Sequence, residues 1–311
     1  MVADAGSGGS PGERRGSAPT LPSVIAVVGG LGAALCWAIA TMSTSRSSKM
    51  IGPSSVLAWV MTIGAVVALV PAVFERPDGP LDPGSIWMAV IAGIAYIIGL
   101  SLIYRALQIG PVSVAAPVVS TEGALAAVFA VVLGEPLESI AALLLAVIAV
   151  GVILASRERP ADPGTVQQFS PEATRRSAMF AIAAAVVFGV GLVTSAKAVT
   201  FGMPVMWNSL IARVLGVVLV LVPLAATGRL RFARAAVPFL VAAGIGEVVG
   251  TSLYTIGAQD GIAIAAVLGA QFATIAVIGA YLLFGERLSR QQVAGVVIVI
   301  AGVALLTVVT V

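Results

Sequence analysis

The 311-residue sequence contains no histidine and a single cysteine, Cys36. The lack of histidine removes the usual ligand sets for zinc and haem, and one cysteine excludes an intrachain disulfide framework. We therefore expect neither a metal site nor a cofactor. Charged residues are also scarce, at 10% of the chain, whereas a soluble domain carries roughly a quarter. The chain leaves no room for a sizeable soluble domain.

The net charge of +3 does not indicate nucleic acid as a partner. The basic residues are scattered at the ends of apolar segments, and no basic patch with interleaved aromatic residues is present. Basic residues beside membrane spans orient a chain in the bilayer. We interpret these charges in that way.

Hydrophobic residues make up 59% of the chain, and the mean hydropathy is +1.09. A helix needs roughly 20 mostly apolar residues to cross a bilayer. Strands are not expected, because period-two alternation is absent and an open sheet cannot sit in lipid. The sequence predicts an all-α polytopic membrane protein of ten transmembrane helices. Their expected ranges are 21–42, 54–74, 85–107, 111–133, 140–155, 178–199, 204–226, 237–258, 262–284 and 292–311.

Four regions are expected along the chain. Residues 1–20 are rich in Gly, Ser and Pro, which predicts a disordered N-terminal tail. Residues 156–176 form the longest break between apolar runs and carry several charged side chains. We interpret this break as the linker between two five-helix repeats, at 21–155 and 177–311.

The two halves are related by a duplication. The stretch 110–135 returns at 261–286, a constant separation of 151 residues, and the same offset pairs Pro53 with Pro204 and Gly99 with Gly250. Such an ungapped register indicates an internal repeat. Because five helices is an odd number, the second half must enter the membrane in the opposite sense. Two inverted five-helix repeats allow a central site to face either side of the membrane.

Gly-Glu closes the fourth span of each half, as Gly134-Glu135 and as Gly285-Glu286. Together with ten spans and a five-plus-five repeat, this pattern resembles the EamA-like branch of the drug/metabolite transporter superfamily. The resemblance covers residues 21–311. It implies a carrier for small metabolites, often an exporter of amino acids or related compounds, with a cavity lined by helices 1 to 4 and 6 to 9. Spans 5 and 10 are apolar nearly all round, which independently predicts that they are peripheral.

Three ionisable residues fall near the middles of their spans: Glu122, Arg213 and Glu247. A charge at the bilayer centre costs at least ~2.5 to 3.5 kcal/mol, so such residues usually face a bundle interior or a wet cavity. Each has two interpretations. Glu247 either binds a ligand or is permanently paired with Arg213. Arg213 either holds a substrate carboxylate or neutralises a glutamate. Glu122 is equally compatible with a binding site and with a structural role. Two acids against one arginine leave one carboxylate that could carry a proton.

Four uncharged residues complete the candidate substrate-binding or coupling set. Gln271 lies midway along span 9, where a cavity or an interhelical role is expected, and Ser120 is its repeat equivalent. Tyr96 is the equivalent of Glu247. Trp37 could stack on a ligand, although ordinary packing is an equally good interpretation.

Glu135 and Glu286 follow a glycine at the end of a span. We expect each carboxylate to lie at the positive N-terminal end of the next helix, with the glycine as a C-cap. The orientation of the chain stays open. Arginines flank one side of the predicted spans, so the positive-inside rule places both termini outside, whereas the resemblance implies termini inside.

We predict a secondary transporter that moves a small metabolite, such as an amino acid, a related compound or a drug-like molecule, across the cell membrane by alternating access. Export is the expected direction. The candidate partners are the substrate, the lipid bilayer, protons and a second copy of the chain. An enzyme is not expected, because no phosphate-binding loop or nucleophile–base pair is visible mid-span. The alternatives are a non-transporting membrane scaffold or receptor subunit and an intramembrane enzyme.

Overall fold

The computed structural model describes residues 24–75, 77, 79–110, 115, 118–156, 170–275, 278 and 289–310. Within these ranges the chain is helical and contains no strand. The elements are α1 (Val24–Ile51), α2 (Pro53–Phe74), α3 (Pro83–Ile109), α5 (Glu122–Val132), α6 (Ser139–Ser156), α7 (Pro171–Thr200), α8 (Val205–Gly216), η1 (Val217–Leu221), α9 (Val222–Ala226), η2 (Arg234–Ala236), α10 (Val237–Ala258), α11 (Ile262–Gly269) and α13 (Arg290–Thr310).

The helices have the length and composition of membrane spans. Six are apolar and long enough to cross a bilayer, and α8, η1 and α9 together form one of these six. Four shorter apolar helices occupy the predicted spans 4, 5, 9 and 10. The prediction of an all-α membrane protein is confirmed. The chain is an integral membrane protein.

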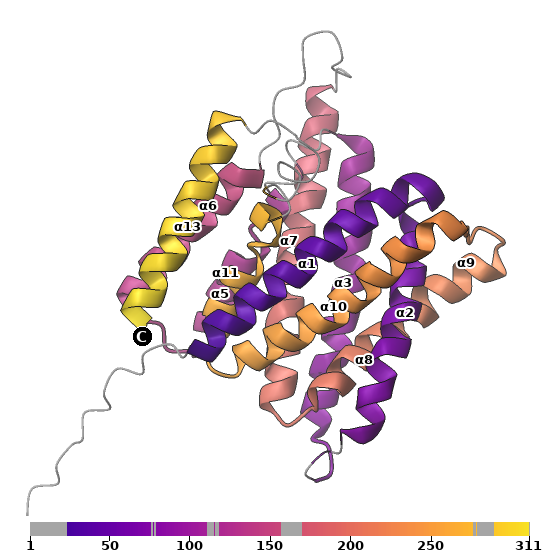
Figure 1. The fold of residues 1–311 in the computed structure, drawn as a ribbon, viewed down its shortest axis with the longest axis horizontal. Coiled ribbons are helices and arrows are strands. Elements are labelled where there is room, and N and C mark those ends of the chain that lie inside the picture. The colour runs from indigo at the N-terminus through magenta and orange to yellow at the C-terminus, as the bar shows by residue number, and fades with distance from the viewer. Residues whose placement is uncertain are drawn as a thin grey trace, which may run out of the picture.

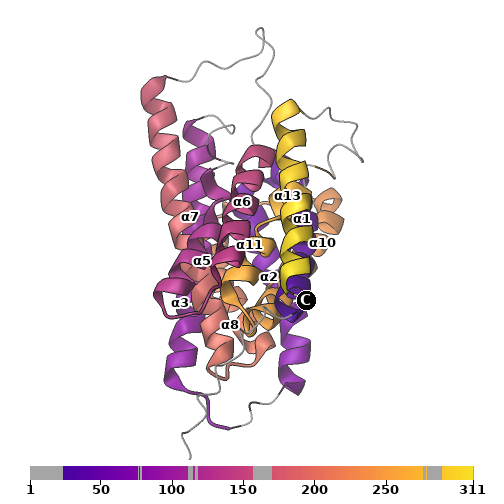
Figure 2. The same ribbon diagram turned by 90° about the vertical axis from the view of Figure 1, so that its left-hand side faces the viewer.

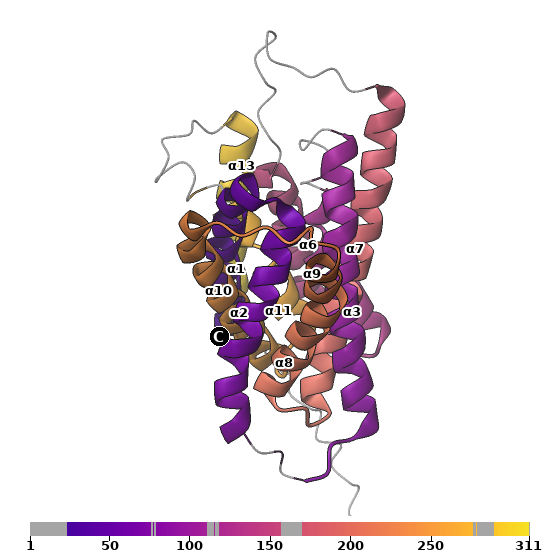
Figure 3. The ribbon, with the colours of Figure 1, turned by 90° about the vertical axis from the view of Figure 1, so that its right-hand side faces the viewer.

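Three antiparallel helix pairs organise the bundle (Figure 1): α1 packs along α10, α3 along α7, and α6 along α13. The pair of α6 and α13 forms an outer layer on one side (Figure 2), which confirms that spans 5 and 10 are peripheral. On the other side, α2 and α8 lie between the α1–α10 pair and the α3–α7 pair (Figure 3).

The contacts of two glycines repeat the internal duplication in space. A Cβ atom on Gly99 of α3 would lie 2.6 Å from Phe188 of α7, and one on Gly250 of α10 would lie 2.7 Å from Trp37 of α1. At the offset of 151 residues, Gly250 corresponds to Gly99 and Phe188 corresponds to Trp37. The two halves therefore pack their third and first helices against each other in equivalent ways, as an inverted repeat requires.

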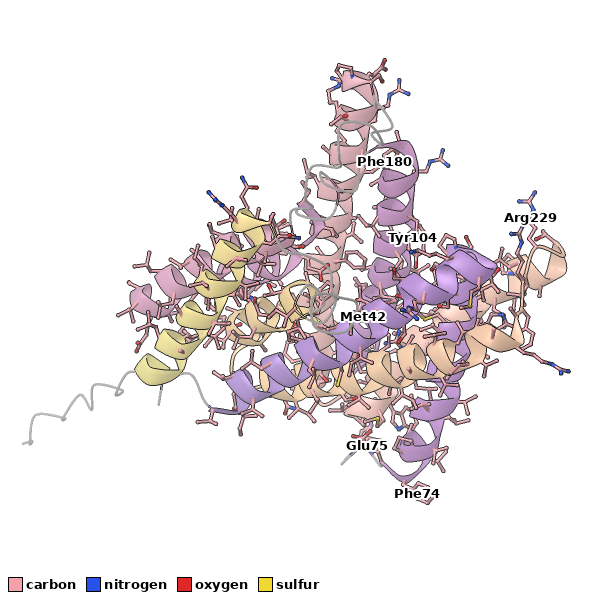
Figure 4. The ribbon with its side chains drawn as sticks, turned by 45° about the horizontal axis from the view of Figure 1, so that its top comes forward. Met42, Phe74, Glu75, Tyr104, Phe180 and Arg229 are labelled. Atoms are coloured by element: carbon pink, nitrogen blue, oxygen red, sulfur yellow. The ribbon has the colours of Figure 1, made fainter. Side chains whose placement is uncertain are left out.

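Charge divides the two ends of the bundle, and Figure 4 labels Glu75 at one end and Arg229 at the other. We call the first the carboxylate end; α2, α5, α7 and α10 finish there. We call the second the arginine end; α1, α3 and α6 finish there. The carboxylate end holds Glu75, Asp82, Glu135, Glu138 and Asp260, with Lys197, and the arginine end holds Arg46, Arg105, Arg175, Arg176, Arg229, Arg231, Arg234 and Arg290.

Two helices extend beyond their predicted ranges. Helix α1 continues to Ile51 through a polar segment, in which the hydroxyl of Ser47 is satisfied by donating to the carbonyl of Ser43 at 3.0 Å. Helix α7 begins at Pro171, inside the predicted linker, where the Ser170 side chain caps the Ala173 N–H at 3.1 Å. Serine at the N-cap with proline at the next position is a strong helix start. The hydrophobic pattern shows neither signal.

The fourth and ninth spans are interrupted at equivalent points. Turns interrupt the helix at residues 120–121 and 270–271, and the N–H groups of Thr121 and Gln271 donate to carbonyls three residues back, at 3.2 and 3.1 Å. Proline 117, which the sequence offers as the cause of a kink in span 4, lies outside the described residues. Discontinuous helices at mid-membrane are typical of the binding regions of transporters.

Candidate functional site

A cavity of about 340 Å³ lies inside the bundle. It is lined by α1, α2, α3, α5, α7, α8 and α10, and by Phe272 just after α11. Both repeats therefore contribute walls. Ligand sites commonly have volumes of roughly 300–1,000 Å³, so this cavity has the size for a small metabolite.

Arg213 and Glu247 form the charged centre of the cavity. Arg213 Nη2 lies 3.4 Å from Glu247 Oε2 and 3.3 Å from the hydroxyl of Thr251. The guanidinium carbon stands 5.3 Å from the ring centre of Tyr96, a cation–π contact. Arg213 is 2% exposed, and its Nε is buried without a hydrogen-bond partner among the described residues. The structure thus shows the pairing of Glu247 with Arg213 that the sequence left as one of two alternatives.

Glu122 lines the same cavity without such a partner. It is the first residue of α5, directly after the turn that interrupts span 4. Within the described part of the chain, the structure gives its carboxylate neither a hydrogen bond nor an ion pair. The N-terminal end of a helix favours a negative charge, which helps to explain how this carboxylate is tolerated in mid-membrane.

Aromatic rings cover much of the remaining wall. Trp37 packs against Tyr254 and Phe272 at centroid distances of 5.9 and 6.5 Å. Tyr96 packs edge-on against Phe188 at 6.1 Å. All five rings line the cavity, so Trp37 and Tyr96 of the predicted site are in place to contact a bound molecule.

The structure does not bring Gln271 and Ser120 into the lining of the cavity. Both are buried, at 2% and 5% exposure. Gln271 Nε2 donates to the carbonyl of Val267 in its own helix at 3.0 Å, and the Thr274 hydroxyl lies 3.5 Å from its Oε1. These residues lie at the interruptions of spans 4 and 9. The cavity side of span 4 is instead the face that carries Glu122.

Two hydrogen bonds join helices at the side of the cavity nearer the carboxylate end. Tyr254 Oη on α10 donates to the carbonyl of Leu192 on α7 at 2.9 Å. Asn208 Nδ2 on α8 donates to the hydroxyl of Ser195 on α7 at 2.8 Å. We call these four residues the carboxylate-end gate. All four also line the cavity, so the gate forms its floor.

Beyond the gate, two carboxylates join the repeats. Glu75, after α2, accepts from the N–H groups of Val205 at 3.1 Å and Met206 at 2.8 Å, at the start of α8. Glu135, after α5, accepts from the Ala263 N–H of α11 at 3.1 Å. Each carboxylate thus satisfies N–H groups of a helix in the opposite half, where the helix dipole favours negative charge.

The expectation that Glu135 caps the next helix is wrong, because its carboxylate reaches α11 rather than α6. The expected C-cap is confirmed: Gly134 has φ +91, and the Glu135 N–H donates to the carbonyl of Ala130 across the helix end. Partial burial raises the pKa of the Glu135 carboxyl, although the N–H groups of Ala263 and Ile262 oppose that rise. Glu286 lies outside the described residues.

Sequence reasoning missed Tyr104 and Phe272 and gave little weight to Asn208. A signal for Tyr104 was present, because Tyr96, Leu100 and Tyr104 form one helical stripe and all line the cavity. Asn208 carries no such signal, since its importance depends on meeting Ser195 on the preceding helix, α7. Among the described residues, no group of three or more His, Cys, Asp or Glu side chains is placed to hold a metal ion.

Comparison with known proteins gives one family match and one structural match of note. The EamA-like transporter family matches residues 24–157 and 175–308, one segment in each half. No curated protein matches the chain. A solved chain titled only "Crystal structure of protein" is similar, with a TM-score of 0.72 and 20% sequence identity, covering 91% of this chain and 98% of that chain. At that identity the likeness concerns the fold alone.

Proposed function

Because the chain belongs to the EamA-like transporter family of the drug/metabolite transporter superfamily, we propose that it is a secondary transporter that exports a small amphipathic metabolite across the cell membrane. The observation that carries the proposal is the cavity, which combines aromatic walls with three charged side chains in otherwise apolar helices. Mid-membrane charges are costly, and a binding pathway is the usual reason for keeping them.

The proposed mechanism is alternating access, and the inverted repeat supports it. At the offset of 151 residues, Leu192 and Tyr254 of the carboxylate-end gate correspond to Thr41 and Ile103, and Ser195 and Asn208 correspond to Thr44 and Leu57. These four equivalents all line the cavity. The side chains of Tyr254 and Asn208 make hydrogen bonds near the carboxylate end, whereas their equivalents Ile103 and Leu57 have no side-chain polar atom to make them. Exchanging the conformations of the two halves would open one end and close the other.

Export is the proposed direction of transport, and it depends on which end of the bundle is cytoplasmic. The positive-inside rule favours the arginine end as cytoplasmic, with both termini outside. The cavity then faces the cytoplasm, where a cargo for export would bind. A proton exchanged at Glu122 or Glu247 is the proposed source of coupling, because two carboxylates share one arginine in the cavity.

Flux in proteoliposomes tests the proposal. Unmodified protein should move at least one class of small amphipathic metabolite, and a pH gradient should change the rate. Glu247→Gln should slow flux by about tenfold or more, because hydrogen bonds to charged groups contribute roughly 1.5–3 kcal/mol. Ser252→Ala is the matched control, because this buried α10 hydroxyl donates within its own helix and lies outside the cavity lining. No flux with folded protein, or equal flux in Glu247→Gln, contradicts a transport role.

A further inference from the structure

The floor of the cavity holds a buried amide with one unused polar atom. Asn208 is 2% exposed and lines the cavity. Its Nδ2 donates to Ser195, whereas its Oδ1 is buried without a hydrogen-bond partner. Reversing the amide would leave the nitrogen unused instead. A buried polar atom without a partner is costly. A ligand that reaches Asn208 can satisfy it.

The position of Asn208 sets the shape of such a ligand. Asn208 lies five residues before Arg213 on α8, which corresponds to about 7.5 Å along the helix axis. The walls of the same cavity include the rings of Trp37, Phe188 and Tyr254. A molecule with a polar group at each end and a flat apolar body between them matches this arrangement.

The charges of the cavity set the sign of the central group. Arg213 is the only cation among the described lining residues, and it already contacts Glu247. Glu122 is the carboxylate without a counter-ion among the described residues. A ligand ammonium would supply that missing charge, whereas a ligand carboxylate would add a third acid beside a single arginine that already pairs with Glu247.

We propose that the cargo is an aromatic ammonium compound without a carboxylate, carrying a hydrogen-bonding group at the far end of its ring. In this arrangement Glu122 holds the ammonium and Asn208 binds the distal group. The proposal rests on the transport function proposed above and narrows it to one chemical class. Asn208 is then both part of the gate and a determinant of specificity.

Three small probes separate the elements of the proposal: phenethylamine has the ring and the ammonium, tyramine adds a distal hydroxyl, and tyrosine adds a carboxylate to tyramine. Equilibrium binding to the full-length protein in nanodiscs needs no substitution. We expect tyramine to bind about 2- to 12-fold more tightly than phenethylamine, the ratio for one neutral hydrogen bond. Tyrosine should bind at least ~10-fold more weakly than tyramine, which corresponds to about 1.4 kcal/mol.

Two substitutions then assign the residues. Asn208→Leu should abolish the preference for tyramine over phenethylamine, measured as the ratio of the two affinities within the same variant. Glu122→Gln should weaken both amines by about tenfold or more, because a charged contact is lost. Ser209→Ala is the matched control, since this neighbouring buried hydroxyl also lacks a hydrogen-bond partner but does not line the cavity. It should retain the unmodified ranking.

Three outcomes would overturn the proposal: folded protein that binds neither amine, tyrosine binding as tightly as tyramine, and a tyramine preference that persists in Asn208→Leu. None of these outcomes removes the transport function, because flux of another metabolite class would survive them. Loss of all flux with intact binding of tyramine would instead refute transport and keep the site. The experiments therefore distinguish a failure of the proposed cargo from a failure of the proposed transport function.

Discussion

The carboxylate end and the arginine end are built from equivalent residues but differ in state. At the carboxylate end, hydrogen bonds from Tyr254 and Asn208 cross between helices, and Glu75 and Glu135 join the two repeats. The equivalents of the gate residues line the same cavity, but Ile103 and Leu57 have no side-chain polar atom that could make these hydrogen bonds. Under the proposed mechanism, one repeated framework adopts a different packing at each end. Alternating access requires this property.

The two ends also differ in chemistry. Tyr254 and Asn208 have Ile103 and Leu57 as their equivalents at the arginine end. Closure there would bury apolar surface rather than form the corresponding hydrogen bonds. The proposed transporter therefore lacks two of the gate's polar side chains at the arginine end, where Ile103 and Leu57 stand with Thr41 and Thr44, so the two closed states should respond differently to substitution.

Locking the gate should have the largest effect. Ser195→Cys with Asn208→Cys, made in a Cys36→Ser background, places two thiols where a side-chain hydrogen bond now spans 2.8 Å. Oxidation should link α7 to α8 and abolish flux, because the carboxylate end can no longer open. A reductant should restore the flux. Mass spectrometry of the oxidised protein checks that the disulfide has formed.

The equivalent pair, Thr44→Cys with Leu57→Cys, provides the matched comparison. Its cysteines face the cavity and should remain reduced in the resting protein, forming a link only when cargo and a gradient drive the exchange. Rapid oxidation of both pairs in resting protein would show that the two ends do not differ in state. Full flux through the oxidised Ser195–Asn208 pair would exclude movement at this gate.

The α1–α10 pair and the α3–α7 pair should respond alike to substitution of their glycines, because the internal repeat makes the two pairs equivalent. Gly250→Ala would bring a methyl group against Trp37, and Gly99→Ala would bring one against Phe188. Overpacking costs roughly 1–3 kcal/mol, so both variants should lower the thermal midpoint of unfolding by similar amounts. Gly79→Ala is the control, since nothing lies within 4 Å of its added atom. A large loss in one variant alone would contradict equivalent packing.

The smallest effect is expected for Glu75→Gln. A carboxylate at a helix N-terminus contributes about 0.3–1 kcal/mol, so its loss should shift the population toward opening at the carboxylate end by about two- to fivefold. Labelling of Ser195→Cys, in the Cys36→Ser background, by a membrane-impermeant thiol reagent added at that end measures the shift.

Asp82→Asn is the control for Glu75→Gln, because Asp82 lies at the same end but caps its own helix α3. It should leave the labelling rate unchanged. Equal labelling in Glu75→Gln and the unmodified protein would show that the Glu75 contact does not hold this end closed.

Glu135 illustrates which contacts can be predicted from neighbouring residues in the sequence and which cannot. Its glycine neighbour and its place after an apolar run correctly predicted a capped helix end, because those signals act within a few residues. The sequence could not identify the helix that receives the carboxylate, since that depends on which N-terminus lies beside it in space. The same reason made Asn208 easy to undervalue, because its partner Ser195 lies on another helix.

The sequence by itself determined the all-α membrane class, the two inverted repeats and the peripheral position of spans 5 and 10. These features follow from apolar run lengths and from a register that is legible along the chain. Only the tertiary structure decided that Arg213 meets Glu247, that Glu122 has no hydrogen bond or ion pair among the described residues, and that Tyr254 and Asn208 bond to α7 at the carboxylate end. Pairing depends on the rotation of each helix about its axis and on which helices become neighbours, and neither can be derived from the repeated sequence.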